Sequence, residues 1–211
     1  AEAAPRTAGP VAQKHDLQRG WCLWVGPASG GPGTSWSDQH VCAHEFATVE
    51  DFWCMHHHAN PPSKLENVDY FLFKKDSAFA GAMDGHSWKG GRWMVKFEDA
   101  KVARLDDLWL SSAMALIGES FENVGSEEVV SGVAASVQNG QVTVELWIGE
   151  PEDDDQVLAI GREYYHTVVA ETPGLWDKAA QKMTFEDFSK HKVVVQLIGP
   201  QASKSTVGIF Q

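Results

Sequence analysis

The dipeptide Asn139-Gly140 lies between two β-prone segments, residues 129–137 and 142–148. An Asn-Gly pair between such segments is the strongest short-range signal for a tight turn that joins two antiparallel strands. Other short apolar segments indicate further strands, at residues 21–25, 40–46, 70–73, 92–97, 193–198 and 207–210. These strands do not alternate with helices in the regular way that a parallel sheet requires. We therefore predict an α+β domain in which an antiparallel meander is combined with three main helices.

The expected helices have recognisable starts. Thr48 precedes a helical pattern and Asp51 follows three residues later, which is a variant of the capping box. Four acidic residues at 152–155 begin another helix, where they complement its dipole. The helix predicted at 105–121 has two apolar stripes, whereas a helix packed on a sheet needs only one. The second stripe indicates either burial between two layers or a docking surface for a partner. An extra helical segment is expected at 177–191.

Charge and apolar content limit the class of protein. The 211 residues carry a formal net charge of −12, which argues against wrapping long nucleic acid by charge alone. No apolar run is long enough for a transmembrane helix, and the N-terminus lacks a signal-peptide pattern, so we expect a cytoplasmic protein with no membrane partner. Residues 1–14 predict a disordered leader. Three cysteines, Cys22, Cys42 and Cys54, lack metal-binding spacing, and we expect them to be reduced, buried thiols.

Sequence motifs for catalysis are missing. The chain has no Gly-x-Ser-x-Gly elbow, no nucleotide-binding fingerprint and no zinc-ligand spacing. The adjacent histidines His56, His57 and His58 lie in a predicted helix, where they cannot all point at one ion. We therefore expect a protein that is not an enzyme and that has no metal or other cofactor.

Two tryptophans stand in polar, glycine- and serine-rich surroundings. Trp36 lies in Thr-Ser-Trp-Ser-Asp, and Trp88 lies in Gly-His-Ser-Trp-Lys-Gly-Gly. A large ring left exposed to water marks an interaction site unless it folds back onto the body of the protein. If it does not fold back, the pair predicts two mobile rings that sandwich a flat ligand.

Several strings of residues together resemble the eukaryotic translation initiation factor 4E family, which binds the 7-methylguanosine cap of messenger RNA. The matching strings are Gln18-Arg19-Gly20-Trp21-Cys22-Leu23-Trp24, Thr48-Val49-Glu50-Asp51-Phe52-Trp53, Asp69-Tyr70, Gly90-Gly91-Arg92-Trp93, Leu116-Ile117-Gly118-Glu119-Ser120-Phe121 and Ile160-Gly161-Arg162. The resemblance implies a curved eight-stranded antiparallel sheet with three long helices on its convex face. It also implies a monomer with one cap-binding domain over residues 15–211.

The resemblance further implies which residues bind the cap. Trp36 matches the first of the two tryptophans that stack on the methylated base, and Trp147 matches the ring that contacts the N7 methyl group. The usual second Trp-Glu pair would align with Ala82 and Met83, which can neither stack nor accept the guanine N–H groups. We therefore expect Trp88 to replace the second ring, and Asp84 to replace the carboxylate at the base edge.

The expected phosphate contacts also depart from the family pattern. Arg92 is retained, and Lys89 and Lys204 are possible helpers. Gln138 and Thr143 stand where the family carries basic residues. Because two charged contacts are missing, we predict cap binding that is weaker and less salt-sensitive than is typical of the family.

A second surface implied by the resemblance lies on the dorsal helices, where the family binds helical peptides with a Tyr-x-x-x-x-Leu-hydrophobic motif. The matching residues are His15, Leu17, Val49, Trp53, Leu110, Met114, Ile117 and Gly118. The expected partner is a scaffold protein of the initiation factor 4G type or a 4E-binding repressor. Ser111 replaces the acidic residue expected to pair with the peptide's arginine, so the choice of partner stays open. The alternative function is a protein-interaction platform or translational repressor with little or no cap binding.

Overall fold

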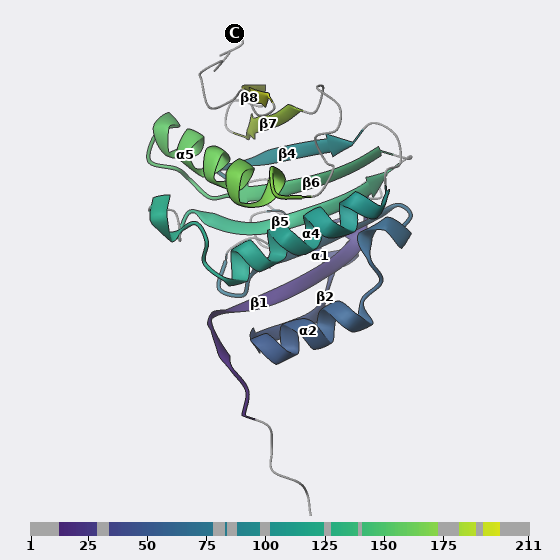
Figure 1. Cartoon of the computed structure of the whole chain (residues 1–211). Helices are drawn as coiled ribbons and strands as arrows, with labels where there is room; N and C mark the ends of the chain where they lie inside the picture. Colours follow the sequence, from purple (N-terminus) through teal and green to yellow (C-terminus); the bar gives the residue numbers. More distant parts are fainter. Residues whose placement is uncertain are drawn as a thin grey trace, which may run out of the picture.

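A computed structural model describes residues 13–28, 34–77, 83, 88–97, 102–124, 128–138, 141–172, 182–188 and 192–198, with the backbone alone at 97, 102, 103, 123, 182 and 192–198. The described strands form one antiparallel eight-stranded sheet in the order β2-β1-β3-β5-β6-β4-β7-β8. Their bounds are β1 Asp16–Pro27, β2 Val41–Thr48, β3 Val68–Lys74, β4 Gly91–Phe97, β5 Val130–Gln138, β6 Gln141–Ile148, β7 Lys182–Asp187 and β8 Lys192–Ile198. The curved antiparallel sheet confirms the predicted α+β class (Figure 1).

The hairpin predicted from Asn139-Gly140 is confirmed. Strands β5 and β6 pair antiparallel, and Gln138 lies opposite Gln141 beside the turn. The sheet is not the simple meander that we predicted, however. Strands β4 and β5 are consecutive in the chain but are not neighbours in the sheet, because β4 lies between β6 and β7.

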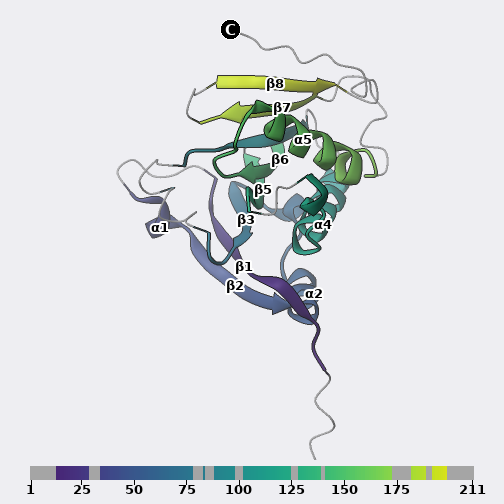
Figure 2. The same cartoon turned by 90° about the vertical axis from the view of Figure 1, so that its left-hand side faces the viewer.

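Helices α2 (Val49–His58), α4 (Val102–Ile117) and α5 (Asp154–Tyr164) cover one face of the sheet, which we call the helix face (Figure 1). The short helix α1 (Trp36–Gln39) lies on the opposite side (Figure 2). A π-helical turn, Tyr165–Val169, extends α5, and single 3-10 turns occur at Pro62–Lys64 and Glu122–Val124.

Side-chain caps set the starts of two of these helices. The Thr48 hydroxyl accepts a hydrogen bond from the Asp51 N–H at 3.2 Å, as the sequence predicts for α2. Asp153 caps α5, and its carboxylate accepts from the Gln156 N–H at 2.8 Å. The cap lies among the four acidic residues that the sequence places at the start of this helix.

Alternation along the strands divides the apolar side chains between the two faces of the sheet. On β3, Tyr70 and Leu72 join the main core beneath the helices, whereas Phe71 and Phe73 join a smaller aromatic cluster on the other face. Helix α5 can approach the sheet closely because of Gly161. A Cβ added at Gly161 would lie 2.3 Å from the buried indole of Trp93, so this position of the helix must carry glycine.

The predicted helical segment at 177–191 is wrong where the structure describes it. Residues Lys182–Asp187 form strand β7, which pairs with β4 and β8. Buried Met183 and Phe185 alternate with partly exposed Thr184 and Glu186, which is the period of a strand. The segment therefore covers the edge of β4 that a helix would leave unpaired.

Helix α4 ends at Ile117, four residues before the predicted end. Glu119 adopts a positive φ of 53°, which breaks the helical path. Phe121 consequently lies beyond the helix and is buried in the core, so it does not belong to the second stripe.

The ends of the chain bear on two further predictions. Of the expected leader, residues 1–12 lie outside the described residues, while the Lys14 ammonium lies 2.5 Å from the Asp51 carboxylate. The strand predicted at 207–210 also lies outside them. Among the described residues, no helix has the length and apolar character needed to cross a membrane.

Candidate functional site

The face of the sheet away from α2, α4 and α5 carries a cluster of aromatic side chains, and we call it the aromatic face. Its buried members are Phe71, Phe73, Ala134 and Trp147, and its partly buried members are Trp24, Trp36, Met83, Trp88 and Phe188. The cluster thus brings together the three tryptophans that the sequence assigns to ligand binding, Trp36, Trp88 and Trp147.

Trp36 begins helix α1, which the Ser35 hydroxyl caps by accepting a hydrogen bond from the Asp38 N–H at 3.2 Å. The indole of Trp36 is partly exposed. Its ring stacks on His40, with centroids 4.2 Å apart and planes 6° apart. Trp24 and Phe71 contact the same ring at centroid distances of 5.5 and 5.7 Å. Trp36 therefore packs against three rings at the edge of the cluster.

Trp147 lies deeper, with 3% of its surface exposed. Phe73, Trp88 and Phe188 surround it at centroid distances of 5.9, 6.1 and 5.2 Å. Trp88 meets it edge-on, with planes 72° apart, and its N–H donates a 2.9 Å hydrogen bond to the Ile148 carbonyl. The sequence left two alternatives for Trp88, a ring that folds back onto the protein and a ring exposed for a ligand. In this structure Trp88 folds back onto the sheet.

Arg92 is the expected phosphate ligand, and the structure gives it two carboxylate partners. Its Nη1 donates to both oxygens of Glu145 at 3.0 and 3.1 Å, while Nε and Nη2 lie 2.9 and 2.8 Å from Glu186 Oε2. The guanidinium also lies 5.5 Å from the Trp147 ring and 5.6 Å from the Phe188 ring. Its charge is therefore already matched by acidic groups within the protein.

These two acidic partners escaped the sequence analysis, although strand pairing places them there. Arg92 lies directly opposite Glu186 on β7, and Glu145 precedes Trp147 by two residues on β6, on the same face. The signal for Glu145 was the alternation of β6, in which Val144 and Leu146 are buried in the main core. The signal for Glu186 required knowing that residues 182–187 form a strand.

Burial shapes the electrostatics of this group. Burial raises the pKa of Glu145, and the Arg92 guanidinium and the Trp147 N–H oppose the shift. Burial also raises the pKa of nearby Asp69, opposed by a Ser136 hydrogen bond and the Arg92 charge. One oxygen, Asp69 Oδ1, is buried without a hydrogen-bond partner among the described residues. On the aromatic face, the carboxylates of Asp69, Glu145 and Glu186 therefore all interact with one guanidinium, that of Arg92.

The other residues expected at the phosphates and base edge are less informative. Lys89 is exposed and lies 3.9 Å from the Glu150 carboxylate, which is a weak surface pair. Asp84 and Lys204 lie outside the described residues.

The residues predicted for partner binding lie on the helix face and on the chain leading to it. Leu17, Trp53, Leu110 and Ile117 pack partly buried against the main core, while Met114 is 40% exposed. Val49 is partly exposed and Gly118 exposed. The opposite stripe of α4, including Leu105, Leu108 and Leu116, is fully buried. The helix therefore buries one stripe and leaves part of the other accessible.

His15 is tied to the start of α2. Its Nδ1 lies 2.6 Å from Glu50 Oε1, and its backbone N–H donates to Glu50 Oε2 at 2.9 Å. The Val49 N–H in turn donates to the His15 carbonyl at 2.9 Å. These contacts hold the chain before β1 against the first turn of α2.

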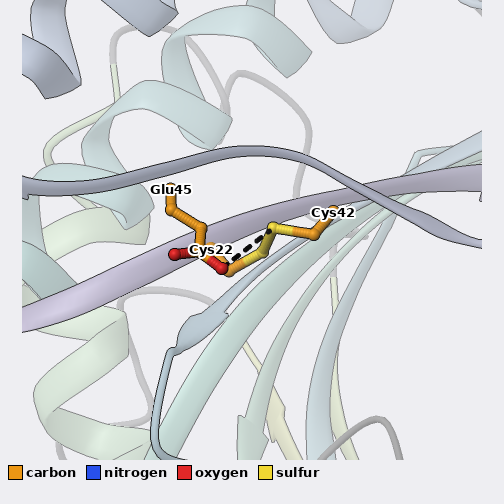
Figure 3. Close-up of side chains that lie close together, drawn as sticks. All are labelled: Cys22, Cys42 and Glu45. Carbon is orange, nitrogen blue, oxygen red and sulfur yellow. Dashed lines mark hydrogen bonds between the residues drawn. A yellow bond between two sulfur atoms is a disulfide. The ribbon is translucent and has the colours of Figure 1, made fainter.

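The expectation of three buried, reduced cysteines is wrong. Cys22 on β1 and Cys42 on β2 form a disulfide, and Cys54 is exposed (Figure 3). A register shift between Leu23 and Trp24 sets the two cysteines diagonally across the strands, with Cα atoms 6.2 Å apart, within disulfide range. The bond lies on the aromatic face, because Cys22 and Trp24 share one side of β1.

Among the described residues, the ligand atoms of Cys22, Cys42 and Glu45 form the single set close enough together to hold a metal ion. The two sulfurs are bonded to each other, so neither can act as a thiolate ligand. Glu45 forms an ion pair with Lys75 at 2.6 Å. We therefore assign no metal to this cluster.

Comparison with known proteins decides the family. The family model described as eukaryotic initiation factor 4E matches residues 16–197, which is most of the chain. The chain belongs to the eukaryotic initiation factor 4E family. The chain is 35% identical over 166 residues to eukaryotic translation initiation factor isoform 4E of Arachis hypogaea, a match that covers 78% of this chain and 79% of the relative.

Solved structures of the initiation factor 4E family share the fold. The complex of Ascaris suum eIF4E-3 with m7G cap superposes with a TM-score of 0.70 at 30% identity, covering 88% of this chain and 98% of that one. The complex of C. elegans eIF4E-3 with the 4E-binding protein Mextli and cap analog gives 0.70 at 28% identity, covering 88% and 100%.

Proposed function

We propose that this initiation factor 4E family member binds the 7-methylguanosine 5′ cap of messenger RNA and recruits a scaffold or repressor protein through its dorsal helices. The observation that carries the proposal is the aromatic face, where Trp36 and Trp147 lie in one cluster within a chain of this family. Relatives of the same fold are solved with cap and with 4E-binding proteins. The protein acts by binding, without catalysis or a cofactor.

Stacking supplies the base recognition in this proposal. Methylation at N7 makes guanine cationic, so an indole on its face contributes cation–π attraction in addition to stacking. Trp36 provides the first ring and Trp88 the second, while Trp147 contacts the methyl group and Asp84 the base edge. Each stacked ring contributes roughly 1–3 kcal/mol. Trp88 has to release the Ile148 carbonyl to turn its face to the base, and Trp147 becomes accessible as Trp88 moves.

Phosphate binding is the weaker half of the site. Arg92 reaches a phosphate only in competition with Glu145 and Glu186, and Lys89 and Lys204 act as helpers. The phosphates therefore contribute less to the cap affinity than the presence of Arg92 alone would indicate, and the base contributes the larger share.

The dorsal residues form the second half of the function. Exposed Met114 and partly exposed Leu110, Trp53 and Ile117 offer apolar side chains to a helical peptide. We place the whole function in one domain, residues 15–211, acting as a monomer in the cytoplasm.

The test is a titration of the protein with 7-methyl-GTP, followed by tryptophan fluorescence, with GTP as the ligand control. We expect saturable quenching that Trp36→Ala abolishes and that Val41→Ala, a change at a 63% exposed position on β2, preserves. Hydrolysis products would instead indicate an enzyme. A flat titration of the wild-type protein refutes cap binding and leaves the interaction platform as the function.

The dorsal surface is tested separately with a synthetic peptide carrying the Tyr-x-x-x-x-Leu-hydrophobic motif. We expect Met114→Asp to lower peptide affinity, because it places a charge where the peptide buries apolar surface. Val41→Ala again serves as the control. Equal affinity of Met114→Asp and wild type would show that partners use another surface.

A further inference from the structure

His40 lies beneath the ring that the proposed function assigns to the base. It directly follows helix α1, and its imidazole is parallel to the Trp36 indole, 4.2 Å away. His40 is 6% exposed, whereas Trp36 is partly exposed. The imidazole therefore covers one face of the indole, which we call the inner face. A base can stack only on the outer face.

Two contacts and the space left by a glycine hold the imidazole in this position. Its Nδ1 lies 2.9 Å from the Trp36 carbonyl oxygen, and because a carbonyl only accepts, Nδ1 carries the proton and donates it. Phe71 meets the imidazole edge-on at 5.5 Å. On β1, a Cβ added at Gly26 would lie 2.2 Å from the ring, so glycine is required for the ring to fit. None of the family-matching strings includes His40 or Gly26.

The imidazole is suited to a neutral support. Burial lowers the pKa of His40, and the bond to the Trp36 carbonyl opposes the shift only in part. A protonated imidazole would place a positive charge on one face of the indole and so compete with a cationic base on the other. A neutral ring supplies contact area without that competition.

We propose that His40 is a positioning residue that holds the Trp36 indole with its outer face toward the methylated base. The proposal rests on the proposed cap binding and extends it to a residue that touches the ligand only through Trp36. Because the supporting ring is already in place, Trp36 is ordered before the cap arrives, and less conformational entropy is lost on binding.

The test uses variants that separate the ring from its hydrogen bond. His40→Phe keeps a planar ring and loses the Nδ1 donor, while His40→Asn keeps a side-chain donor and loses the ring. The Trp36 carbonyl keeps the backbone N–H of residue 40 as a partner in both variants. Gly26→Ala displaces the imidazole without changing it. His44→Ala removes an exposed histidine from β2 and is the matched control.

Two readouts are measured on each folded variant. Near-UV circular dichroism, as the difference from Trp36→Ala, reports the order of the Trp36 ring without ligand. Fluorescence titration with 7-methyl-GTP reports affinity. We expect His40→Asn and Gly26→Ala to lose most of the Trp36 dichroism and to bind about fivefold to tenfold more weakly, the range of one aromatic pair. We expect His40→Phe and His44→Ala to stay within about twofold of wild type on the same grounds.

The outcomes separate this inference from the function on which it rests. Unchanged dichroism in His40→Asn and Gly26→Ala overturns the positioning role, whatever the affinity. Tighter 7-methyl-GTP binding by His40→Asn also overturns it, because the imidazole would then be occupying the place of the base. If wild type binds no 7-methyl-GTP, the proposed function fails, while the dichroism still decides whether His40 orders Trp36.

Discussion

The guanidinium of Arg92 forms two hydrogen bonds, of 3.0 and 3.1 Å, with the buried carboxylate of Glu145. The same carboxylate accepts the Trp147 indole N–H at 2.9 Å. Arg92, Glu145 and Trp147 therefore form one connected group beneath the aromatic face, and a change at any of them affects the others.

Removing the guanidinium should destabilise the fold. Arg92→Met leaves Glu145 buried without its cation, and we expect a loss of about 3 kcal/mol in the free energy of unfolding, the lower end for buried pairs. The pKa of Glu145, already raised by burial, then rises further. The folded state binds a proton that the unfolded state releases, so stability falls as pH rises from 4.5 through the raised pKa.

Urea unfolding at pH 5 and pH 8 measures both effects. Adding Glu145→Gln to Arg92→Met should restore most of the stability and remove the pH dependence, because the amide still accepts the Trp147 N–H without a charge. Lys75→Met, which breaks an exposed pair with Glu45, is the control and should leave the unfolding midpoint unchanged. An Arg92→Met protein as stable as wild type at pH 8 would mean that the pair is not buried in solution.

Phosphates should add little to cap affinity. Because Arg92 is held by Glu145 and Glu186, we expect 7-methyl-GTP and 7-methyl-GMP to bind with similar affinity and with a log–log salt slope below about two. Glu186→Gln removes one competitor and should tighten 7-methyl-GTP binding by roughly fivefold, with a smaller effect on 7-methylguanosine. Fluorescence titrations at two salt concentrations measure these quantities. A steep salt slope in wild type would contradict the expectation.

The disulfide should contribute measurably to stability. Cys22 and Cys42 are 20 residues apart in sequence, and a loop of this size corresponds to about 3 kcal/mol. Adding a dithiol reductant, or making Cys22→Ser, should lower the melting temperature, whereas Cys54→Ser should not change it. Alkylation of the unreduced, denatured chain should modify one thiol, that of Cys54. Three modified thiols would show that the pair is reduced in the protein as isolated, as expected for a reducing compartment.

His15 should titrate above its ordinary range. Its hydrogen bond to Glu50 raises the pKa of His15 above 6.5 and lowers the pKa of Glu50 to about 2. The pair is fully charged between pH 4.5 and 6.5. Its contribution to the free energy of unfolding is lost as pH rises through the His15 pKa or falls through the Glu50 pKa. An NMR titration of the His15 ring measures the shift, and Glu50→Gln should return the pKa toward 6.5. Equal values in both proteins would exclude the pair in solution.

Local signals predicted much of the fold. The Asn139-Gly140 turn and the Thr48 cap depend on neighbouring residues alone, and both are confirmed. From the sequence we predict a helix at 177–191 in place of strand β7, although Met183 and Phe185 alternate with polar residues. Its place beside β4 depends on contacts between distant parts of the chain.

The candidate site was predictable as a set of rings but not as an electrostatic arrangement. The resemblance to the family implied that Trp36 and Trp147 bind the base, and the structure brings the two rings into one cluster. The partners of Arg92 depend on strand register, and the Cys22–Cys42 bond depends on a register shift that no local pattern reveals. The alternation of residues 40–46 predicts a strand that includes His40, whereas β2 begins at Val41 and the His40 imidazole stacks on Trp36.

The disulfide has one further consequence for the base-binding region. The segment between its two cysteines contains Trp24, Gly26, Trp36 and His40, so the stacking ring and its neighbours other than Phe71 lie within one covalently closed loop. When the chain unfolds, these four residues stay close together, and the entropy of bringing them back into contact is smaller than for an open chain. The contacts among these four residues can therefore form again locally, independently of helices α2, α4 and α5 on the other face of the sheet.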